Sequence, residues 1–399
     1  MRRGDRAKKV LRLSEPTLPT RLTFYEFFAG AGMVRTGLGA GWTCLRANDI
    51  DAKKGRTYQR NFGGSALQVG DIAALGLDEL PGVADLVWGS FPCQDLSLAG
   101  VGAGLSGKRS GTFHAFWDAV RLLRDDGRAP RLVAIENVCG ALTSHDGRDF
   151  DVICRTFADA GYRYGALVIN ADLFVPQSRP RLFVVGVRED VPIDPPLLAS
   201  GPSAPFHTDA LRRAVAGLSD RAKAAWLWWS LPVPPSRARR FCDEIEERPV
   251  GVAWHDAAKT QRLLAMMSPV NRLKVEHARQ AGRPVVGGLY RRTRTGADGA
   301  KIQRAEVRFD DVAGCLRTPA GGSSRQVIMV VDGDQVRTRL LSARETARLM
   351  GLPDEYILPA NYNDAYHLTG DGVVVQVVRH LARDLLEPLI NPPPPAVGR

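Results

Sequence analysis

Short apolar runs rich in Val, Ile, Leu and Phe recur through the N-terminal half of the chain, and segments of helical length separate them. This alternation is typical of βαβ units, in which helices cover both faces of a parallel sheet. It predicts an α/β domain over residues 21–190 with a mixed, mostly parallel sheet. The apolar runs lie at residues 22–28, 44–47, 67–69, 86–88, 132–135, 166–169 and 182–187.

A change in composition near residue 190 predicts a second, smaller and irregular domain over residues 191–338. Residues 191–205 and 231–235 are rich in Pro and Ser, as linkers and irregular regions often are. The segment 191–338 carries 23 Lys or Arg against 15 Asp or Glu, a net charge of +8 out of +11 for the whole chain. Concentrated positive charge favours a polyanionic partner, and a solvated basic face is the alternative.

Helix-capping residues and composition indicate the structure of the two ends of the chain and of the segment after residue 338. Ser342 and Glu345 have the spacing of a capping box before a helical pattern, which predicts that residues 339–390 return to the first domain. We expect a flexible arm at residues 1–20 and a disordered Pro-rich tail at 391–399. Trp226, Trp228 and Trp229 could stack on bases, but their apolar setting favours a small core.

Several classes of protein are disfavoured by the sequence. The longest apolar runs are far shorter than the roughly 18 residues of a membrane helix, and no apolar segment follows the basic N-terminus. We therefore expect a cytoplasmic protein that does not act at a membrane. The six cysteines lack the C-x-x-C spacing of zinc sites, so no metal is expected. Five of them are expected to be small buried hydrophobes: Cys44, Cys139, Cys154, Cys242 and Cys315.

Polar and glycine residues follow the predicted strands at the edge where a ligand would bind. A Gly-rich turn at residues 29–32 follows the first strand, which allows the backbone to approach a nucleotide-like ligand closely. A tight βα turn without a ligand is the alternative. Asp49, Asp51 and Asp71 follow the next two strands, where a carboxylate can accept hydrogen bonds from ribose hydroxyls. Phosphate binding is disfavoured because no Gly-Lys-Ser/Thr sequence is present.

Three further strand ends carry groups suited to catalysis. Cys93 follows a strand and a proline, and a Gly-rich stretch at residues 100–111 beyond it suggests a mobile lid. Glu136 follows an apolar strand, where burial would raise its pKa, although a helix-capping carboxylate is the alternative. Arg179 and Arg181 enter the next strand and point the same way, as residues two apart in a strand do.

Six of these segments, in this order, resemble the motifs of the DNA cytosine-5 methyltransferase family. The similarity extends over residues 22–390 and includes a long basic insert between the fourth and fifth motifs. The motifs are FAGAG (28–32), GSFPCQ (89–94), ENV (136–138), QSRPR (177–181), RLLSARETARLMGLP (339–353) and GDGVVV (370–375).

The resemblance implies a Rossmann-like, S-adenosylmethionine-dependent catalytic domain and a smaller target recognition domain. It implies methyl transfer to C5 of a cytosine flipped out of duplex DNA. In that reaction Cys93 attacks C6, Glu136 contacts N3 and the exocyclic amine, and Arg181 stabilises charge at O2, oriented by Arg179. The implied cofactor site consists of Phe28, Ala29, Gly30, Ala31, Gly32, Met33, Asp49, Ile50, Asp71, Ile72, Ser90, Pro92, Phe113, Asp371 and Val373.

The resemblance implies a lid at residues 94–111 that closes on the flipped base. DNA-binding residues are predicted in this lid, in the basic insert and in its polar loop at residues 318–325. Duplex DNA is the expected partner of a monomeric enzyme, with a cognate restriction endonuclease acting separately. Because restriction-modification is the more common role in the family, the resemblance favours it over an orphan regulatory role. The predicted DNA-binding residues are Gln94, Ser97 and Arg109, then Arg291, Arg292 and Arg294, and finally Ser323, Ser324 and Arg325.

Three positions depart from the family pattern, and two other functions stay open. Met33 replaces a usual glycine, Asp371 a usual asparagine and Gln376 a common proline. Asp371 could favour the cationic sulfonium of the cofactor, or it could serve only the local turn. A tRNA cytosine methyltransferase is the nearest alternative, although its Cys-Phe-Thr signature is absent. A non-catalytic DNA-binding relative would be expected to lose Cys93 or Glu136, and both are present.

Overall fold

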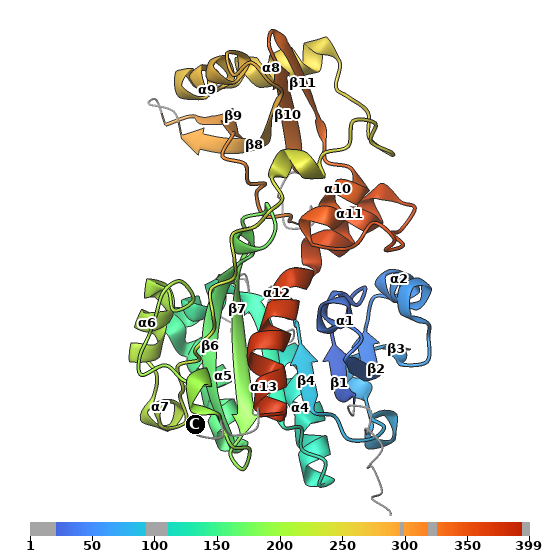
Figure 1. Ribbon diagram of the computed structural model, residues 1–399, viewed down its shortest axis with the longest axis vertical. Coiled ribbons are helices and arrows are strands. Elements are labelled where there is room, and N and C mark those ends of the chain that lie inside the picture. The colour runs from blue at the N-terminus through green and yellow to red at the C-terminus, as the bar shows by residue number, and fades with distance from the viewer. Residues whose placement is uncertain (1–20, 93–110, 296–298, 318–324, 393–399) are drawn as a thin grey trace, which may run out of the picture.

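The computed structural model describes residues 21–92, 111–295, 299–317 and 325–392. The predicted arm at residues 1–20 and most of the predicted tail at 391–399 lie outside these ranges. A seven-stranded sheet organises one end of the molecule and a four-stranded sheet the other (Figure 1). Within the described ranges, no helix has both the length and the apolar character needed to cross a membrane.

The larger sheet contains β1 (Leu22–Phe27), β2 (Trp42–Asp49), β3 (Leu67–Val69), β4 (Leu86–Gly89), β5 (Leu132–Val138), β6 (Tyr162–Asn170) and β7 (Pro180–Arg188). Its strand order is β3-β2-β1-β4-β5-β7-β6. The first five strands in this order are parallel, and β7 is antiparallel to both of its neighbours. This confirms the predicted mixed sheet. β7 is reversed because the connection at 171–179 is too short for the crossover that a parallel strand requires.

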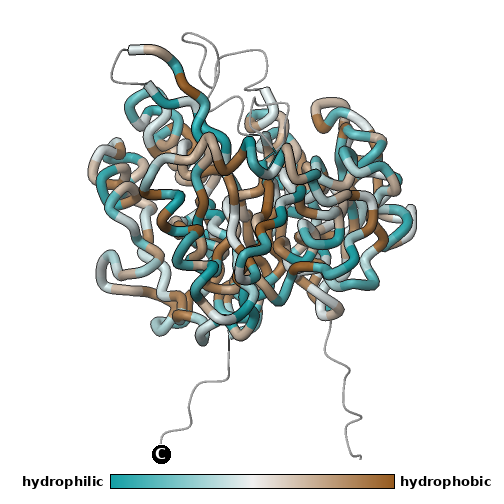
Figure 2. Tube along the Cα trace, turned by 90° about the horizontal axis from the view of Figure 1, so that it is seen from above, coloured by the Kyte–Doolittle hydropathy of each residue, from teal (hydrophilic) through white to brown (hydrophobic). Residues whose placement is uncertain are grey.

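Helices cover both faces of this sheet. Two cores result, one on each side, and apolar strands run through the middle of the molecule (Figure 2). One face carries α1 (Met33–Leu38), α12 (Val375–Leu381) and α13 (Glu387–Ile390), and α2 (Ala52–Phe62) lies beside β2 and β3. The other face carries α4 (Gly111–Asp125), α5 (Arg148–Asp159), α6 (Asp209–Ala216) and α7 (Asp220–Ala224).

The smaller domain is more regular than the sequence predicts. Its antiparallel sheet has the order β11-β10-β8-β9, and two helices pack on it over a separate core. Alternating apolar residues such as Leu289, Val327 and Met329 supply that core. The elements are β8 (Val285–Thr295), β9 (Lys301–Arg308), β10 (Val327–Asp332), β11 (Gln335–Leu340), α8 (Ala257–Ala265) and α9 (Pro269–Arg279).

The boundary predicted at residue 191 is too early. Trp226 bridges to Tyr164 of β6, and Nε1 of Trp229 donates to the carbonyl oxygen of Val185 in β7 at 3.1 Å. Gly165 makes room for this contact, because an added Cβ there would lie 2.3 Å from the carbonyl oxygen of Leu227. The tryptophans do pack, as predicted, but they form no small core of their own: Trp229 is buried in the core on one face of the large sheet, and Trp226 and Trp228 pack against the core on the other face. The large domain therefore extends to about residue 229.

Two helices connect the two sheets, α10 (Ala343–Leu349) and α11 (Tyr362–Asp371) (Figure 1). The predicted capping box at the start of α10 is present: Oγ of Ser342 accepts from the Glu345 N–H at 3.1 Å, and a Glu345 oxygen accepts from the Ser342 N–H. Arg339 forms a fully buried ion pair with Glu345. Residues 339 and 340 still belong to β11 of the smaller sheet, so the chain leaves that sheet at the capping box, slightly later than the predicted residue 339.

Candidate functional site

The Gly-rich turn leaves β1 in a left-handed conformation. Phe28 has a φ of 57°, and Gly30 and Gly32 also have positive φ. A Cβ added to Gly30 would meet no atom of the described residues within 4 Å, whereas one added to Gly32 would lie 2.4 Å from the Phe62 ring. Gly30 is therefore open on the side where a ligand could approach, and Gly32 is required for packing. Ala29, Ala31 and Met33 are buried.

Two carboxylates stand at the ends of β2 and β3. Asp49 is nearly buried, and its two oxygens accept from the N–H groups of Gly30 at 2.7 Å and Asp51 at 2.8 Å. Asp49 therefore ties the Gly-rich turn to the start of α2. Ile50 beside it is 70% exposed, which is unusual for a large apolar side chain. Asp71 is exposed, and its carboxylate caps a short 3₁₀ turn whose Ile72 is buried.

Glu136 and Arg181 form the charged centre of the site. Oε1 of Glu136 is 3.1 Å from Nε of Arg181, and both side chains are largely buried. Burial raises the pKa of Glu136, and the two arginines at positions 181 and 179 oppose this rise. Ser90, at the end of β4, also hydrogen-bonds the Glu136 carboxylate. The structure thus brings together three of the predicted residues from three strands.

Arg179 lies in a different setting from the predicted one. Its guanidinium donates to the carbonyl oxygens of Leu316 at 2.9 Å, Gly370 at 2.8 Å and Gly372 at 2.7 Å. The side chain is only 2% exposed. Arg179 therefore holds together three segments that are distant in sequence, and this bracing role accounts for its position better than contact with a substrate does.

The segment that carries the predicted nucleophile is only partly described. Cys93 lies outside the described residues, and Pro92 before it is exposed. Nδ2 of Asn137 donates to the carbonyl oxygen of Phe91 at 3.3 Å, so the end of β5 is tied to this segment. Phe91 lies between the rings of Phe28 and Phe113, with ring centroids 6.4 and 5.5 Å away. The buried Phe113 therefore supports the turn through Phe91.

The three departures from the family pattern have local explanations. Met33 packs against Gly372, where an added Cβ would lie 2.3 Å from Sδ. Oδ2 of Asp371 is 2.7 Å from Nζ of Lys54 in α2, an ion pair that neither sequence-based alternative included. Gln376 packs against Gly351 and donates to its carbonyl oxygen at 3.3 Å. Val373 is buried beside them.

Of the predicted DNA-binding residues, four are described. Arg291, Arg292 and Arg294 are exposed on β8. Arg292 and Arg294 pair with Glu306 of β9, whereas no ion pair of Arg291 is found in the described part of the chain. Arg325 donates to Asn363 at the start of α11. The others, Gln94, Ser97, Arg109, Ser323 and Ser324, lie outside the described residues.

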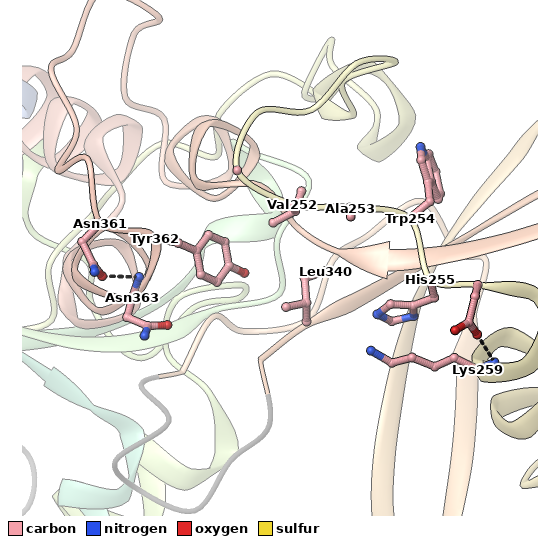
Figure 3. Close-up of a pocket in the computed structure, with 11 residues that line it drawn as sticks. Val252, Ala253, Trp254, His255, Lys259, Leu340, Asn361, Tyr362 and Asn363 are labelled. Carbon is pink, nitrogen blue, oxygen red and sulfur yellow. Dashed lines mark hydrogen bonds between the residues drawn. The ribbon is translucent and has the colours of Figure 1, made fainter.

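A hollow of about 550 Å³ lies elsewhere, between the smaller domain and the start of α11 (Figure 3). Trp254, His255 and Lys259 line one side, and Asn361 and Tyr362 the other. None of the predicted site residues that the structure describes lines it. Among the described residues, no group of three or more His, Cys, Asp or Glu side chains could hold a metal ion.

Two polar groups near the site were not predicted. Glu26 of β1 is 1% exposed, and neither carboxylate oxygen has a hydrogen-bond partner within the described residues. Burial raises its pKa to about 8. Cys315 was expected to be an inert hydrophobe, but Sγ lies 3.4 Å from Nη1 of Arg179. A carboxylate within an apolar strand was a visible signal for Glu26, whereas nothing in the local sequence marks Cys315.

Comparisons with known proteins agree with this geometry. The Type II methyltransferase M.HpaII of Haemophilus parainfluenzae is 27% identical over 402 residues, covering 95% of this chain and 93% of its own. M.HhaI of Haemophilus parahaemolyticus is 26% identical over 371 residues, covering 92% and 94%. The solved Dnmt2 methyltransferase of S. pombe covers 92% of this chain and 99% of its own, with a TM-score of 0.56 and 19% identity, which supports the fold.

The family assignment rests on the whole chain and not on one motif. The family model for C-5 cytosine-specific DNA methylases matches residues 22–387, which include both sheets and all six motifs. The resemblance drawn from those motifs is thereby confirmed. The chain belongs to the C-5 cytosine-specific DNA methylase family and is a DNA (cytosine-5)-methyltransferase.

Proposed function

We propose that this enzyme transfers a methyl group from S-adenosylmethionine to C5 of a cytosine that is flipped out of a specific duplex DNA sequence. The intermediate is a covalent bond between Sγ of Cys93 and C6 of the base. A stacked cytosine exposes neither face to a thiol, so the base must leave the helix. The observation that carries the proposal is the buried Glu136–Arg181 pair at the end of β5, beside the segment that leads to Cys93.

The cofactor would lie at the carboxyl ends of β1, β2 and β3. The open side of Gly30 permits close approach, Ile50 and Phe28 offer apolar surfaces for an adenine, and Asp49 and Asp71 offer acceptors for hydroxyl and amino groups. These features fit S-adenosylmethionine, which when bound supplies an electrophilic methyl group. Asp49 also holds the Gly-rich turn through Gly30, so binding and loop geometry depend on the same carboxylate.

The described residues explain how a poor nucleophile could be activated. C5 of cytosine becomes nucleophilic once a thiolate adds to C6, because the addition removes the aromaticity of the ring. Glu136 in its protonated form would donate to N3, and Arg181 would stabilise the negative charge that develops at O2. Burial raises the pKa of Glu136, which favours this protonated form. Once C5 carries the transferred methyl group, loss of its proton re-forms the C5–C6 double bond, and the C6–S bond breaks to release the Cys93 thiolate.

Duplex DNA is the proposed substrate, and the relatives named Type II methyltransferases suggest a restriction-modification role. The basic smaller domain, with its exposed arginines on β8, supports a nucleic-acid substrate, and the absence of the Cys-Phe-Thr signature supports DNA over tRNA. The test is transfer of tritium from labelled cofactor to duplex DNA and to tRNA, with Cys93→Ser as the control. Label in DNA that depends on Cys93 supports the proposal. Label in tRNA alone would overturn it.

A further inference from the structure

Arg179 is a buried cation without a carboxylate partner in the described part of the chain. Three of the four side-chain hydrogen bonds that it makes there go to backbone carbonyl oxygens, and its Nε has no partner among the described residues. Burial and the neighbouring Arg181 lower its pKa to about 10. A buried charge without a counter-ion is costly, so a nearby group that can become negative would be stabilised.

Cys315 is the group in that position. Its Sγ accepts the fourth side-chain hydrogen bond of Arg179, from Nη1 at 3.4 Å, and the side chain is half-buried. The charged or titratable groups that face it are Arg179 just before β7, Arg181 on β7, Arg317 on its own segment, and Tyr366 on α11. Three of these four groups are cationic, and the fourth is a neutral phenol at physiological pH.

The other possible anion of this cluster already has a partner. Glu136 pairs with Arg181, and burial raises its pKa, so it does not neutralise both arginines. The carbonyl oxygen of Leu316 lies 3.5 Å from Sγ and could accept a thiol proton. That oxygen already accepts from Nη1 of Arg179 at 2.9 Å, which makes it a weaker acceptor for the thiol.

We propose that Cys315 is the counter-ion of Arg179 and forms a second nucleophilic thiol beside the catalytic centre, where soft electrophiles such as alkyl halides modify the enzyme. Although burial raises the pKa of Cys315, the three arginines lower it below the ordinary value of a thiol. In the reaction with iodoacetamide, the thiolate sulfur forms a bond to the methylene carbon, the carbon–iodine bond breaks, and iodide leaves.

Modification would act on the active site through Arg179. This guanidinium joins Leu316 to Gly370 and Gly372 at the end of α11, close to the ion pair of Asp371 and Lys54. An alkylated sulfur carries no negative charge and needs more room than a thiolate. We therefore expect alkylation to loosen the contact between the end of α11 and the segment that contains Leu316.

The test measures alkylation rates by iodoacetamide across pH, with mass spectrometry of the peptides. All measurements use the Cys93→Ser protein, because this substitution removes the proposed catalytic thiol. Cys242 is the internal control, because it is also half-buried but burial and Asp243 raise its pKa. The rate of each thiol is divided by the limiting rate that the same thiol reaches at high pH. On this scale Cys315 should react at least about tenfold faster than Cys242 near pH 6.5, because only the thiolate reacts. Equal normalised rates for the two thiols would overturn the proposal. A Cys315 rate that reaches its plateau at a higher pH than the Cys242 rate would do so as well.

Two variants test the role of the guanidinium directly. Arg179→Met should move the plateau of Cys315 to higher pH without moving that of Cys242, whereas Arg179→Lys should retain part of the difference. An unmoved plateau in a folded Arg179→Met protein would overturn the assignment of counter-ion. If that variant does not fold, the comparison of the two thiols in the Cys93→Ser protein decides. Labelling requires neither DNA nor cofactor, so the outcome is independent of the proposed methyl transfer.

Discussion

Glu136 and Arg181 are diagonal neighbours on paired antiparallel strands: Arg181 lies opposite Val138, two residues after Glu136, and the two side chains meet at 3.1 Å. The pairing depends on the reversed direction of β7. It places a carboxyl group whose pKa is raised by burial next to a permanent cation at the end of β5. An acid and an adjacent cation are the two groups that protonation at N3 and charge at O2 would require.

Replacement of Arg181 by Met should move the alkaline limb of the kcat/KM profile to higher pH. The Arg181 guanidinium lowers the pKa of Glu136, so its removal should raise that pKa. Because Glu136 donates from its protonated form in the proposed reaction, the enzyme should then stay active to higher pH. Glu136→Gln should lower kcat by about 100-fold or more. Methyl transfer to duplex DNA measured from about pH 6 to pH 9 checks both. If Arg181→Met leaves the alkaline limb in place, that limb does not belong to Glu136.

Glu26→Gln should stabilise the enzyme at alkaline pH. Burial raises the pKa of Glu26 from 4.5 to about 8, so the folded state holds a proton that the unfolded state has lost, and stability falls as pH rises through this window. The free energy of unfolding falls by at most roughly 1.4 kcal/mol per pH unit in this window. Thermal melts at increasing pH should show a difference in Tm between variant and wild type that grows up to about pH 8. A difference that does not depend on pH would contradict the assignment.

Asp371 and Lys54 should influence the preference for S-adenosylmethionine over S-adenosylhomocysteine in opposite directions. Their ion pair at 2.7 Å offsets the carboxylate charge, so Asp371→Asn should weaken the preference by about 1 kcal/mol or less. Lys54→Met leaves the carboxylate without that partner and should strengthen the preference. Calorimetric titration of both ligands measures the ratio, with the double variant as control. Equal ratios in all four proteins would mean that Asp371 serves only to hold α11 on α2.

The arginines of β8 should differ in their contribution to DNA binding. Arg292 and Arg294 share Glu306, so Arg291 is the most available of the three for a phosphate. Arg291→Ala should reduce the slope of log affinity against log salt by about 0.9, the value for one phosphate contact. Arg292→Ala should change the slope less. Anisotropy titrations over a range of salt concentrations check this, and an unchanged slope in Arg291→Ala would assign that residue to solvated surface.

The large sheet and the ends of its strands could be predicted because each depends on local signals. Apolar runs followed by Gly, Asp or Glu indicate both the strand and the edge where ligands bind, and Glu136 was found in this way. The antiparallel direction of β7 could not be predicted, because it follows from the short connection between β6 and β7. The length of that connection is known only once the ends of both strands are known. The tryptophan cluster was correctly predicted to be packed, although it joins the two cores of the large sheet and forms none of its own. Its attachment to β6 depended on the space beside Gly165, which no local pattern reveals.

The role of Arg179 could not be predicted from its neighbours in sequence. Its partners Leu316 and Gly370 lie 137 and 191 residues further along the chain. A pair of arginines before a strand gives no indication that one will be buried against carbonyl groups and the other will reach a carboxylate. The setting of Cys315 follows from that burial and could not be predicted for the same reason.

The central claim is that Cys93 forms a bond to C6 of a cytosine in duplex DNA. The most direct measurement is incubation of the wild-type enzyme with cofactor and a duplex that carries 5-fluorocytosine at the target, followed by denaturing electrophoresis and mass spectrometry. Fluorine at C5 cannot leave as a proton does, so a stable adduct on the Cys93 peptide is expected, and Cys93→Ser should form none. An enzyme that methylates the normal duplex but gives no denaturant-stable adduct, or an adduct at another residue, would contradict the account.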